Sequence, residues 1–398
     1  MAAFESPDFL RLDELFTPEE RQLRDYVRSF VTERFLPVVV EHHRAGTIPL
    51  ELAPELGRLG AFGPTIRGYG CSGLGNVAAG LIMQELERGD SGLRTFASVQ
   101  GSLAMMGIYL FGSEEQKERW LPDMARGEKL GAFGLTEPNF GSNPAGMQCR
   151  ARETADGYMI NGAKKWIGNA TIADVTVVWA KLGDTNDQQS VRGFLVEKGT
   201  PGFKPSLIEG KLSLRIGLTA EIRFENCQIS RDAILPESGG LRSPLECLNH
   251  ARFGIAWGAI GAAMACYDEA RQYALNREQF GKPIASFQLV QAKLVQMLTE
   301  ITKAQLLAYR VAQMKDAGTA KHYHISMAKM NNVAIALDIA RTARDMLGAE
   351  GILDTRACMR HMCNLESVKT YEGTEDIHRL ILGQQITGIS AFGADADR

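Results

Sequence analysis

The spacing of apolar and polar residues changes twice along the chain and divides it into three parts. Residues 1–130 carry mostly helical patterns, with clear helix starts at Thr17-Pro18, followed by two glutamates, and at Ser113, followed by Glu-Glu-Gln. A small polar cap, proline at the first position and acids in the first turn favour a helix start. Gly- and Pro-containing segments separate these patterns. We predict an N-terminal helical domain over residues 1–130.

From residue 131 to about 245 the pattern becomes short β-like runs broken by Gly, Asn and Pro. Residues 175–180 are continuous and rich in β-branched side chains, whereas residues 221–225 alternate with a period of two. Such runs at short spacing are typical of a small barrel or sandwich and not of βαβ units. We predict a middle β domain over residues 131–245.

The chain becomes helical again after about residue 246. One stretch has apolar residues at the i, i+4, i+7, i+8 spacing of a buried helical stripe, namely Val290, Leu294, Met297, Leu298 and Ile301. Further helices are predicted over roughly 320–347 and 375–390. Four long helices joined by short turns indicate a bundle over residues 246–398. The predicted fold class is therefore α+β, mostly α: helical domain, β barrel or sandwich, four-helix bundle.

Composition narrows the class of protein. A chain of 398 residues is too long for one ordinary hydrophobic core, so two or three domains are expected. Its content of 45% hydrophobic and 23% charged residues is average for a globular protein. The net charge is −3, and positive and negative residues are interspersed without a basic block, which argues against nucleic-acid and membrane partners. Seven scattered cysteines form no CxxC pair, so we expect reduced thiols and no metal site. The acidic N-terminus and the lack of a long apolar run lead us to expect a cytoplasmic protein.

The run from Thr370 to His378 contains the strongest candidate for catalysis. Glu372 lies between Tyr371 and a flexible Gly373, just before an apolar helical stretch. A carboxylate in an apolar pocket has a raised pKa and acts as a general base near neutral pH. The alternative is a plain helix start, with Thr374 as N-cap and acids in the first turn. The two interpretations are compatible.

Three further segments are rich in Gly, aromatic or small polar residues. Residues 133–143 form a Gly/Ser/Thr loop able to present N–H groups and hydroxyls to a ring edge or a phosphate. Residues 165–169 place an indole beside a glycine, which suits a flat ring close to the backbone. Arg277 and Phe280-Gly281 are followed by Phe287-Gln288. Taken alone, each segment is better explained as an ordinary loop or a solvated helix end.

Taken together and in this order, these segments resemble the acyl-CoA dehydrogenase family of flavoproteins, from about residue 15 to the C-terminus. The resemblance is most specific at residues 133–142, 166–169, 277–281 and 371–374. Residues 85–94, 98–100, 249–257 and 386–389 are most similar to the glutaryl-CoA dehydrogenase branch.

The resemblance implies non-covalent FAD, held between the β domain and the C-terminal bundle of a homotetramer whose subunits share the cofactor site. It assigns the flavin ring and pyrophosphate to Phe133, Leu135, Thr136, Ser142, Trp166, Ile167 and Gly168. The ADP half is assigned to Arg277, Phe280 and Gln288, across a subunit interface. The remaining cofactor shell is Asp345, Met346, Leu347, Gly348, Ala349, Thr374 and Asp376.

The resemblance also places the catalytic base at Glu372. Some members carry the base at the position of Ala251, which cannot serve here. Arg94, oriented by Glu87, would bind the distal carboxylate of glutaryl-CoA, which would then lose CO2 to give crotonyl-CoA. Without the resemblance, a surface Glu–Arg pair is favoured, and Gly89 and Gly92 argue against one unbroken helix. The other substrate contacts implied are Thr95, Ser142, Asn249, Arg252, Tyr371 and Gly373.

Departures from the family pattern leave alternatives open. Gly168 stands where dehydrogenases of the family usually have Thr or Ser, whereas acyl-CoA oxidases often have glycine there. Oxygen is therefore an alternative electron acceptor to an electron-transferring flavoprotein. Thr95, Phe140, Asn143 and residues 348–351 also differ, which leaves room for another dicarboxylyl or short-chain acyl-CoA. Two other classes are a flavin enzyme acting on carrier-bound acyl groups and a pseudo-enzyme. The presence of both Glu372 and Arg94 argues against the latter.

Overall fold

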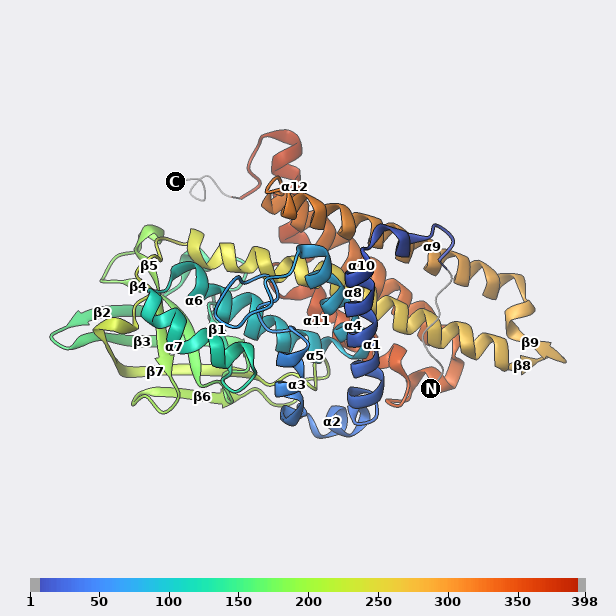
Figure 1. The fold of residues 1–398 in the computed structure, drawn as a ribbon, viewed down its shortest axis with the longest axis horizontal. Helices are drawn as coiled ribbons and strands as arrows, with labels where there is room; N and C mark the ends of the chain where they lie inside the picture. Colours follow the sequence, from blue (N-terminus) through green and yellow to red (C-terminus); the bar gives the residue numbers. More distant parts are fainter. Residues whose placement is uncertain (1–7, 393–398) are drawn as a thin grey trace.

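The computed structural model describes residues 8–392, and its first part is helical (Figure 1). Both predicted helix starts are confirmed, since Thr17 caps α1 and Ser113 caps α7, each in a capping box. The helices of this part are α1 (Pro18–Phe30), α2 (Val39–Ala45), α3 (Ala53–Arg58), α4 (Asn76–Gly89), α5 (Ser91–Ser98), α6 (Met106–Phe111) and α7 (Glu114–Ala125). A π-helical segment, η4 (Val99–Met105), joins α5 to α6.

The middle part forms one seven-stranded mixed sheet. The predicted β domain is therefore confirmed, but its strands belong to one sheet and not to the two sheets of a sandwich. The strands are β1 (Gly131–Gly134), β2 (Arg150–Thr154), β3 (Gly157–Gly168), β4 (Val175–Leu182), β5 (Val191–Glu197), β6 (Phe203–Leu207) and β7 (Thr219–Ser230). The order is β1-β4-β2-β3-β7-β6, with β5 antiparallel to β4. Because β4 is buried over nearly its whole length, its sequence is continuous rather than alternating.

The C-terminal part contains five α-helices among the described residues, one more than predicted. They are α8 (Arg242–Asn276), α9 (Gln288–Asp316), α10 (His322–Met346), α11 (Ala357–Thr370) and α12 (Glu375–Thr387). A small hairpin, β8 (Glu278–Gln279) and β9 (Lys282–Pro283), lies between α8 and α9, at the end of the molecule opposite the sheet (Figure 1). The turn between α11 and α12 carries Glu372.

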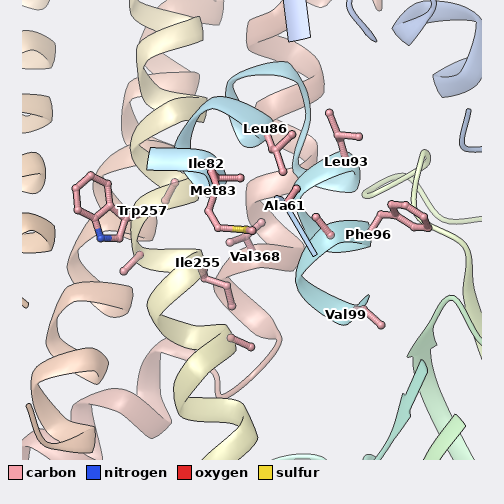
Figure 2. Packing of buried hydrophobic residues seen from close by; sticks show 14 of the residues in the cluster. Ala61, Ile82, Met83, Leu86, Leu93, Phe96, Val99, Ile255, Trp257 and Val368 are labelled. Carbon is pink, nitrogen blue, oxygen red and sulfur yellow. The ribbon is translucent and has the colours of Figure 1, made fainter. Parts of the chain in front are cut away.

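The N-terminal helices and the C-terminal helices share one hydrophobic core, while the sheet has a second core of its own. Figure 2 shows side chains of α4, α5, α8 and α11 meeting in the shared core, among them Leu86, Phe96, Trp257 and Val368. The helix α4 is buried along its length and lies against α8. Within residues 8–392, no helix is long and apolar enough to cross a membrane.

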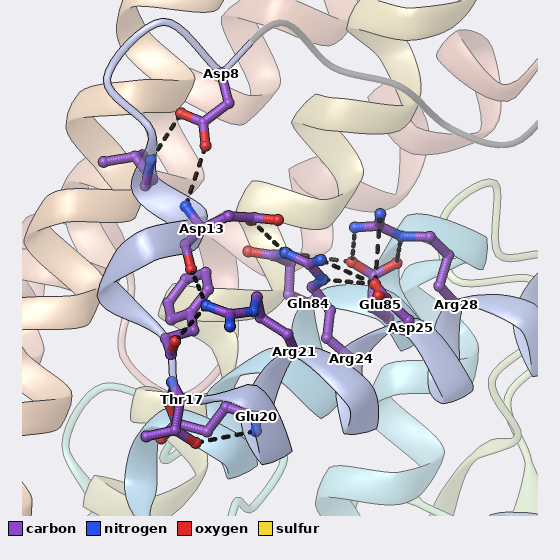
Figure 3. Close-up of polar contacts among 12 residues, drawn as sticks. Asp8, Asp13, Thr17, Glu20, Arg21, Arg24, Asp25, Arg28, Gln84 and Glu85 are labelled. Atoms are coloured by element: carbon purple, nitrogen blue, oxygen red, sulfur yellow. Dashed lines mark hydrogen bonds and ion pairs between the residues drawn. The ribbon is translucent and has the colours of Figure 1, made fainter.

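A buried ionic cluster fastens α1 to α4 (Figure 3). Glu85 is fully buried, and its two carboxylate oxygens accept bonds from Arg28 Nη2 at 2.9 Å and Nε at 3.0 Å and from Arg88 Nε at 2.9 Å. Burial alone would raise the pKa of Glu85, but the two guanidinium groups outweigh it and hold this pKa below its ordinary value. The cluster is structural, because every oxygen of the carboxylate has a partner.

Candidate active site

Glu372 lies in the turn between α11 and α12, in a left-handed backbone conformation. Its φ is 53° and that of Gly373 is 95°. A non-glycine residue in this region costs about 1–3 kcal/mol, and such residues cluster at functional sites. Thr374 caps α12 by accepting from the Ile377 amide, so the helix-start interpretation is confirmed. Position 373 favours glycine, because L side chains rarely adopt its φ of 95° and a Cβ there would lie 3.1 Å from His378 Nε2.

Side chains from two helices hold this turn. Arg252 of α8 donates from Nε to the Glu372 carbonyl at 2.7 Å. Lys329 of α10 donates from Nζ to the carbonyls of Tyr371 at 3.0 Å and Gly373 at 2.8 Å. Three successive carbonyls are therefore each bound by a cationic side chain.

Glu372 is half-buried, and one of its two carboxylate oxygens is buried without a partner. Its Oε2 is inaccessible to solvent and makes no hydrogen bond to any described residue. Burial raises the pKa of Glu372 to about 7, although the positive charges of Arg94, Arg252 and Lys329 oppose the shift. A carboxyl group with this pKa is suited to accept a proton near neutral pH.

Arg94 and Glu87 form a fully buried pair beside Glu372, so the surface-pair interpretation is wrong. Arg94 Nε donates to Glu87 Oε2 at 2.6 Å, and both side chains are at most 1% exposed. Arg94 Nη2 also contacts the hydroxyl of Tyr371, next to the base. Gly258 of α8 makes the close approach possible, because a Cβ there would lie 2.0 Å from Glu87 Oε2.

The break between Glu87 and Arg94, indicated by the two glycines, falls at Asp90. This residue ends α4, and its carboxylate accepts from the Gly92 amide at 2.7 Å to start α5. Thr95 follows Arg94 on α5, and its hydroxyl lies 3.4 Å from the Tyr371 hydroxyl. Asn249 lies half-buried on α8 close to Arg252, and Ala251 between them is fully buried. Every residue predicted near the acyl group except Ser142 therefore lies on α4, α5, α8 or the Glu372 turn.

The predicted flavin loop lies beside the end of β3. The Lys165 amide donates to the Thr136 carbonyl at 2.8 Å, and buried Lys164 holds both the Leu135 carbonyl and the carboxylate of Glu137. Phe133, Leu135 and Ile167 have buried side chains. Ser142 is exposed on the loop.

Trp166 and Gly168 fit the neighbourhood of a flat ring. Trp166 is 57% exposed although it is a large aromatic residue, and its φ of 65° is left-handed. Gly168 faces Val99 of η4, whose Cγ2 would lie 3.1 Å from any Cβ added there. A threonine at this position would thus require a small shift of the Val99 side chain. These features fit the isoalloxazine ring of FAD.

The residues predicted for the ADP half lie elsewhere in the chain. Arg277, Phe280 and Gln288 belong to the β8–β9 end of the molecule, far from the sheet (Figure 1), and Phe280 is 92% exposed. Residues 345–349 follow at the end of α10, where Asp345 pairs with Lys293 of α9 at 2.6 Å. Thr374 and Asp376, in contrast, lie close to Glu372 at the start of α12. One chain therefore does not bring the two halves of the predicted cofactor site together.

The sequence interpretation missed three residues at the site: Lys329, Gly258 and His378. Lys329 had a detectable signal, since a lysine occupies the apolar face of α10 beside Ile325 and Val333. Gly258 and His378 had none, because their importance arises from close approach between segments distant in sequence.

Comparisons with known proteins identify the family to which each part of the chain belongs. Family models for the N-terminal, middle and C-terminal domains of acyl-CoA dehydrogenase match residues 17–128, 132–227 and 238–387.

Among solved structures, a glutaryl-CoA dehydrogenase from Mycobacterium smegmatis in complex with FADH2 is 47% identical, with a TM-score of 0.94 over 96% of this chain and 98% of that chain. A chain of a structure described as the electron transferring flavoprotein of Acidaminococcus fermentans is 32% identical, with a TM-score of 0.90 over 94% and 98%. The human mitochondrial short-chain specific acyl-CoA dehydrogenase is 33% identical over 92% of this chain and 89% of its own length. This chain belongs to the acyl-CoA dehydrogenase family.

Proposed function

We propose that this acyl-CoA dehydrogenase acts on glutaryl-CoA and converts it to crotonyl-CoA and CO2. The observation that carries the proposal is Arg94, a buried guanidinium close to the Glu372 carboxylate, whose Oε2 has no partner. A short-chain monocarboxylic acyl group offers nothing to pair with this charge. The 47% identity to a glutaryl-CoA dehydrogenase supports the same choice over the short-chain relatives.

In this proposal Glu372 removes a proton from the carbon next to the thioester. Its raised pKa keeps it basic enough for this task, and its turn is held rigidly by Arg252 and Lys329. FAD is the cofactor of the family, and the Mycobacterium smegmatis neighbour contains its reduced form. When bound, FAD supplies the two-electron oxidation. Trp166, Thr136, Ser142 and Gly168 are the residues that would lie against it.

Arg94 selects the substrate through its terminal carboxylate. Its Nε is committed to Glu87, which fixes the plane of the guanidinium, and its Nη2 reaches Tyr371. A distal carboxylate would compete for the Nη atoms and gain charge-assisted hydrogen bonds in a site shielded from water. With the acyl chain anchored at this end, the proton-bearing carbon is directed toward Glu372.

Anaerobic titration of the yellow protein with a panel of acyl-CoAs tests the proposal. Glutaryl-CoA is expected to bleach the flavin fastest, and mass spectrometry is expected to show crotonyl-CoA with release of CO2. Faster bleaching by butyryl-CoA, or a five-carbon unsaturated product without CO2, would contradict the glutaryl assignment and leave a short-chain or dicarboxylyl dehydrogenase.

We further propose an electron-transferring flavoprotein as the acceptor. The similarity to a chain in the Acidaminococcus fermentans structure supports it. Gly168 favours the alternative, oxygen, because it removes a hydroxyl from the flavin's neighbourhood. Against this alternative, the Val99 side chain packs against Gly168 and restricts the space that the missing hydroxyl would leave. Turnover in air without other acceptors separates the two: rapid peroxide formation would identify an oxidase.

Finally, we propose a cytoplasmic homotetramer in which neighbouring subunits complete each cofactor site. The exposed ends of the bundle support this assembly, since Phe280, Leu289 and Ile386 are each at least 80% exposed. The seven free cysteines agree with a reducing compartment. Sedimentation of the flavin-loaded protein at about four times 43.6 kDa is expected, and a stable monomer that retains FAD would contradict the shared site.

A further inference from the structure

We propose that Lys329 is a positioning residue for the base, and that its amine fixes the turn from which the Glu372 carboxylate reaches the substrate. The inference rests on the proposed role of Glu372 as the base. Lys329 does not touch the carboxylate. It acts through the backbone on both sides of Glu372.

The contacts of Lys329 flank the base symmetrically. Its Nζ binds the carbonyl of the residue before Glu372 and the carbonyl of the residue after it. Arg252 binds the carbonyl of Glu372 itself. Because Glu372 and Gly373 are both left-handed, the turn needs such external support to persist.

The cost of burying Lys329 indicates that these bonds matter. The side chain is 1% exposed, and burial lowers its pKa to about 7, with the Glu372 carboxylate opposing the shift. The charged groups that act on it are Glu372 and Glu375, which favour its charge, and Arg252 and Arg94, which oppose it. An amine retains two N–H donors even when neutral, so both bonds to the turn persist in either protonation state. For packing alone, an apolar side chain of similar length would serve α10 as well.

Asn332 offers a matched control on the same helix. It is fully buried, and its amide donates to two main-chain carbonyls, those of Ala256 at 2.9 Å and Ala304 at 3.2 Å. These carbonyls belong to α8 and α9 and not to the turn. Loss of Asn332 therefore weakens the bundle without removing a contact of residues 371–373.

The test compares Lys329→Met and Asn332→Leu as flavin-loaded proteins in stopped-flow reduction by glutaryl-CoA and by butyryl-CoA. For Lys329→Met we expect the limiting rate of flavin reduction to fall roughly 10²-fold with both substrates, because a small misplacement of a reacting group costs about that much. The acyl-CoA Kd is expected to change less than about threefold, and the isotope effect for α-deuterated substrate to increase as proton removal becomes limiting. Asn332→Leu is expected to lower Tm while keeping the limiting rate within about threefold of the wild type.

A second variant covers the case in which Lys329→Met does not fold. Lys329→Gln keeps an NH2 donor on a shorter chain, so we expect a slower limiting rate than the wild type at equal flavin content. Lys329 variants that lose no more rate than Asn332→Leu, or that lose affinity instead of rate, would overturn the inference. If the wild type itself is not bleached by either acyl-CoA, the proposed function fails, which is a different outcome.

Discussion

Two glutamates in this protein, the fully buried Glu85 and the half-buried Glu372, show what distinguishes a structural carboxylate from a reactive one. Both lie among positive charges, yet the pKa of Glu85 is below its ordinary value and that of Glu372 is raised to about 7. Arg28 points its N–H donors at the oxygens of Glu85 (Figure 3), and Arg88 Nε donates to the same carboxylate. Around Glu372 the donors point elsewhere.

Each cation near Glu372 has another partner. Arg94 binds Glu87 and Tyr371, Arg252 binds the Glu372 carbonyl, and Lys329 binds the carbonyls on either side. Their charges moderate the pKa of Glu372 but do not satisfy its carboxylate. The direction of the hydrogen bonds, more than the number of nearby charges, thus decides which glutamate stays basic.

Removing the reactive carboxylate gives the largest expected effect. We expect Glu372→Gln to lower the rate of flavin reduction by roughly 10²- to 10⁴-fold, the usual contribution of a general base. Stability is expected to be retained or to increase near pH 8, because a half-buried charge whose Oε2 has no partner is removed. Stopped-flow reduction and thermal unfolding measure both. A variant that reduces flavin at the wild-type rate would show that another group takes the proton.

Removing the substrate-selecting charge is expected to have a smaller and selective effect. For Arg94→Ala we expect kcat/KM to fall about 10²-fold more with glutaryl-CoA than with butyryl-CoA, because loss of one partner of a buried charge pair costs about 2–5 kcal/mol. Equal losses with the two substrates would remove Arg94 from carboxylate binding. The ratio between substrates is the informative quantity, since the variant also leaves Glu87 unpaired.

Breaking the structural glutamate is expected to leave turnover nearly unchanged. Glu85→Gln leaves Arg28 and Arg88 without their carboxylate, so we expect the free energy of unfolding to fall by about 3–5 kcal/mol. The kcat with glutaryl-CoA is expected to stay within about twofold. Denaturant unfolding and steady-state assays test this; a large loss of kcat would mean that the α1–α4 cluster also supports catalysis.

The sequence predicted local features well and long-range contacts poorly. Helix starts at Thr17, Ser113 and Thr374 were predictable because a cap and its amide partner lie within three residues. Glu372 was a candidate from its own sequence run, whereas the role of Arg94 came only from the family resemblance. The burial of the Arg94–Glu87 pair was not predicted from the residues alone, which favoured a surface pair. Lys329 was missed because its partners lie more than forty residues further along the chain, and only folding brings them together.

The pH dependence of kcat/KM tests the central claim that Glu372 is the base. The unprotonated form is required, so the wild type is expected to gain activity about tenfold per pH unit below a midpoint near 7 and to level off above it. Glu85→Gln is expected to keep this midpoint, and Glu372→Gln to be slow and independent of pH over the same range. A wild-type midpoint near the ordinary glutamate value of 4.5, or a Glu372→Gln variant that retains the wild-type profile, would contradict the account.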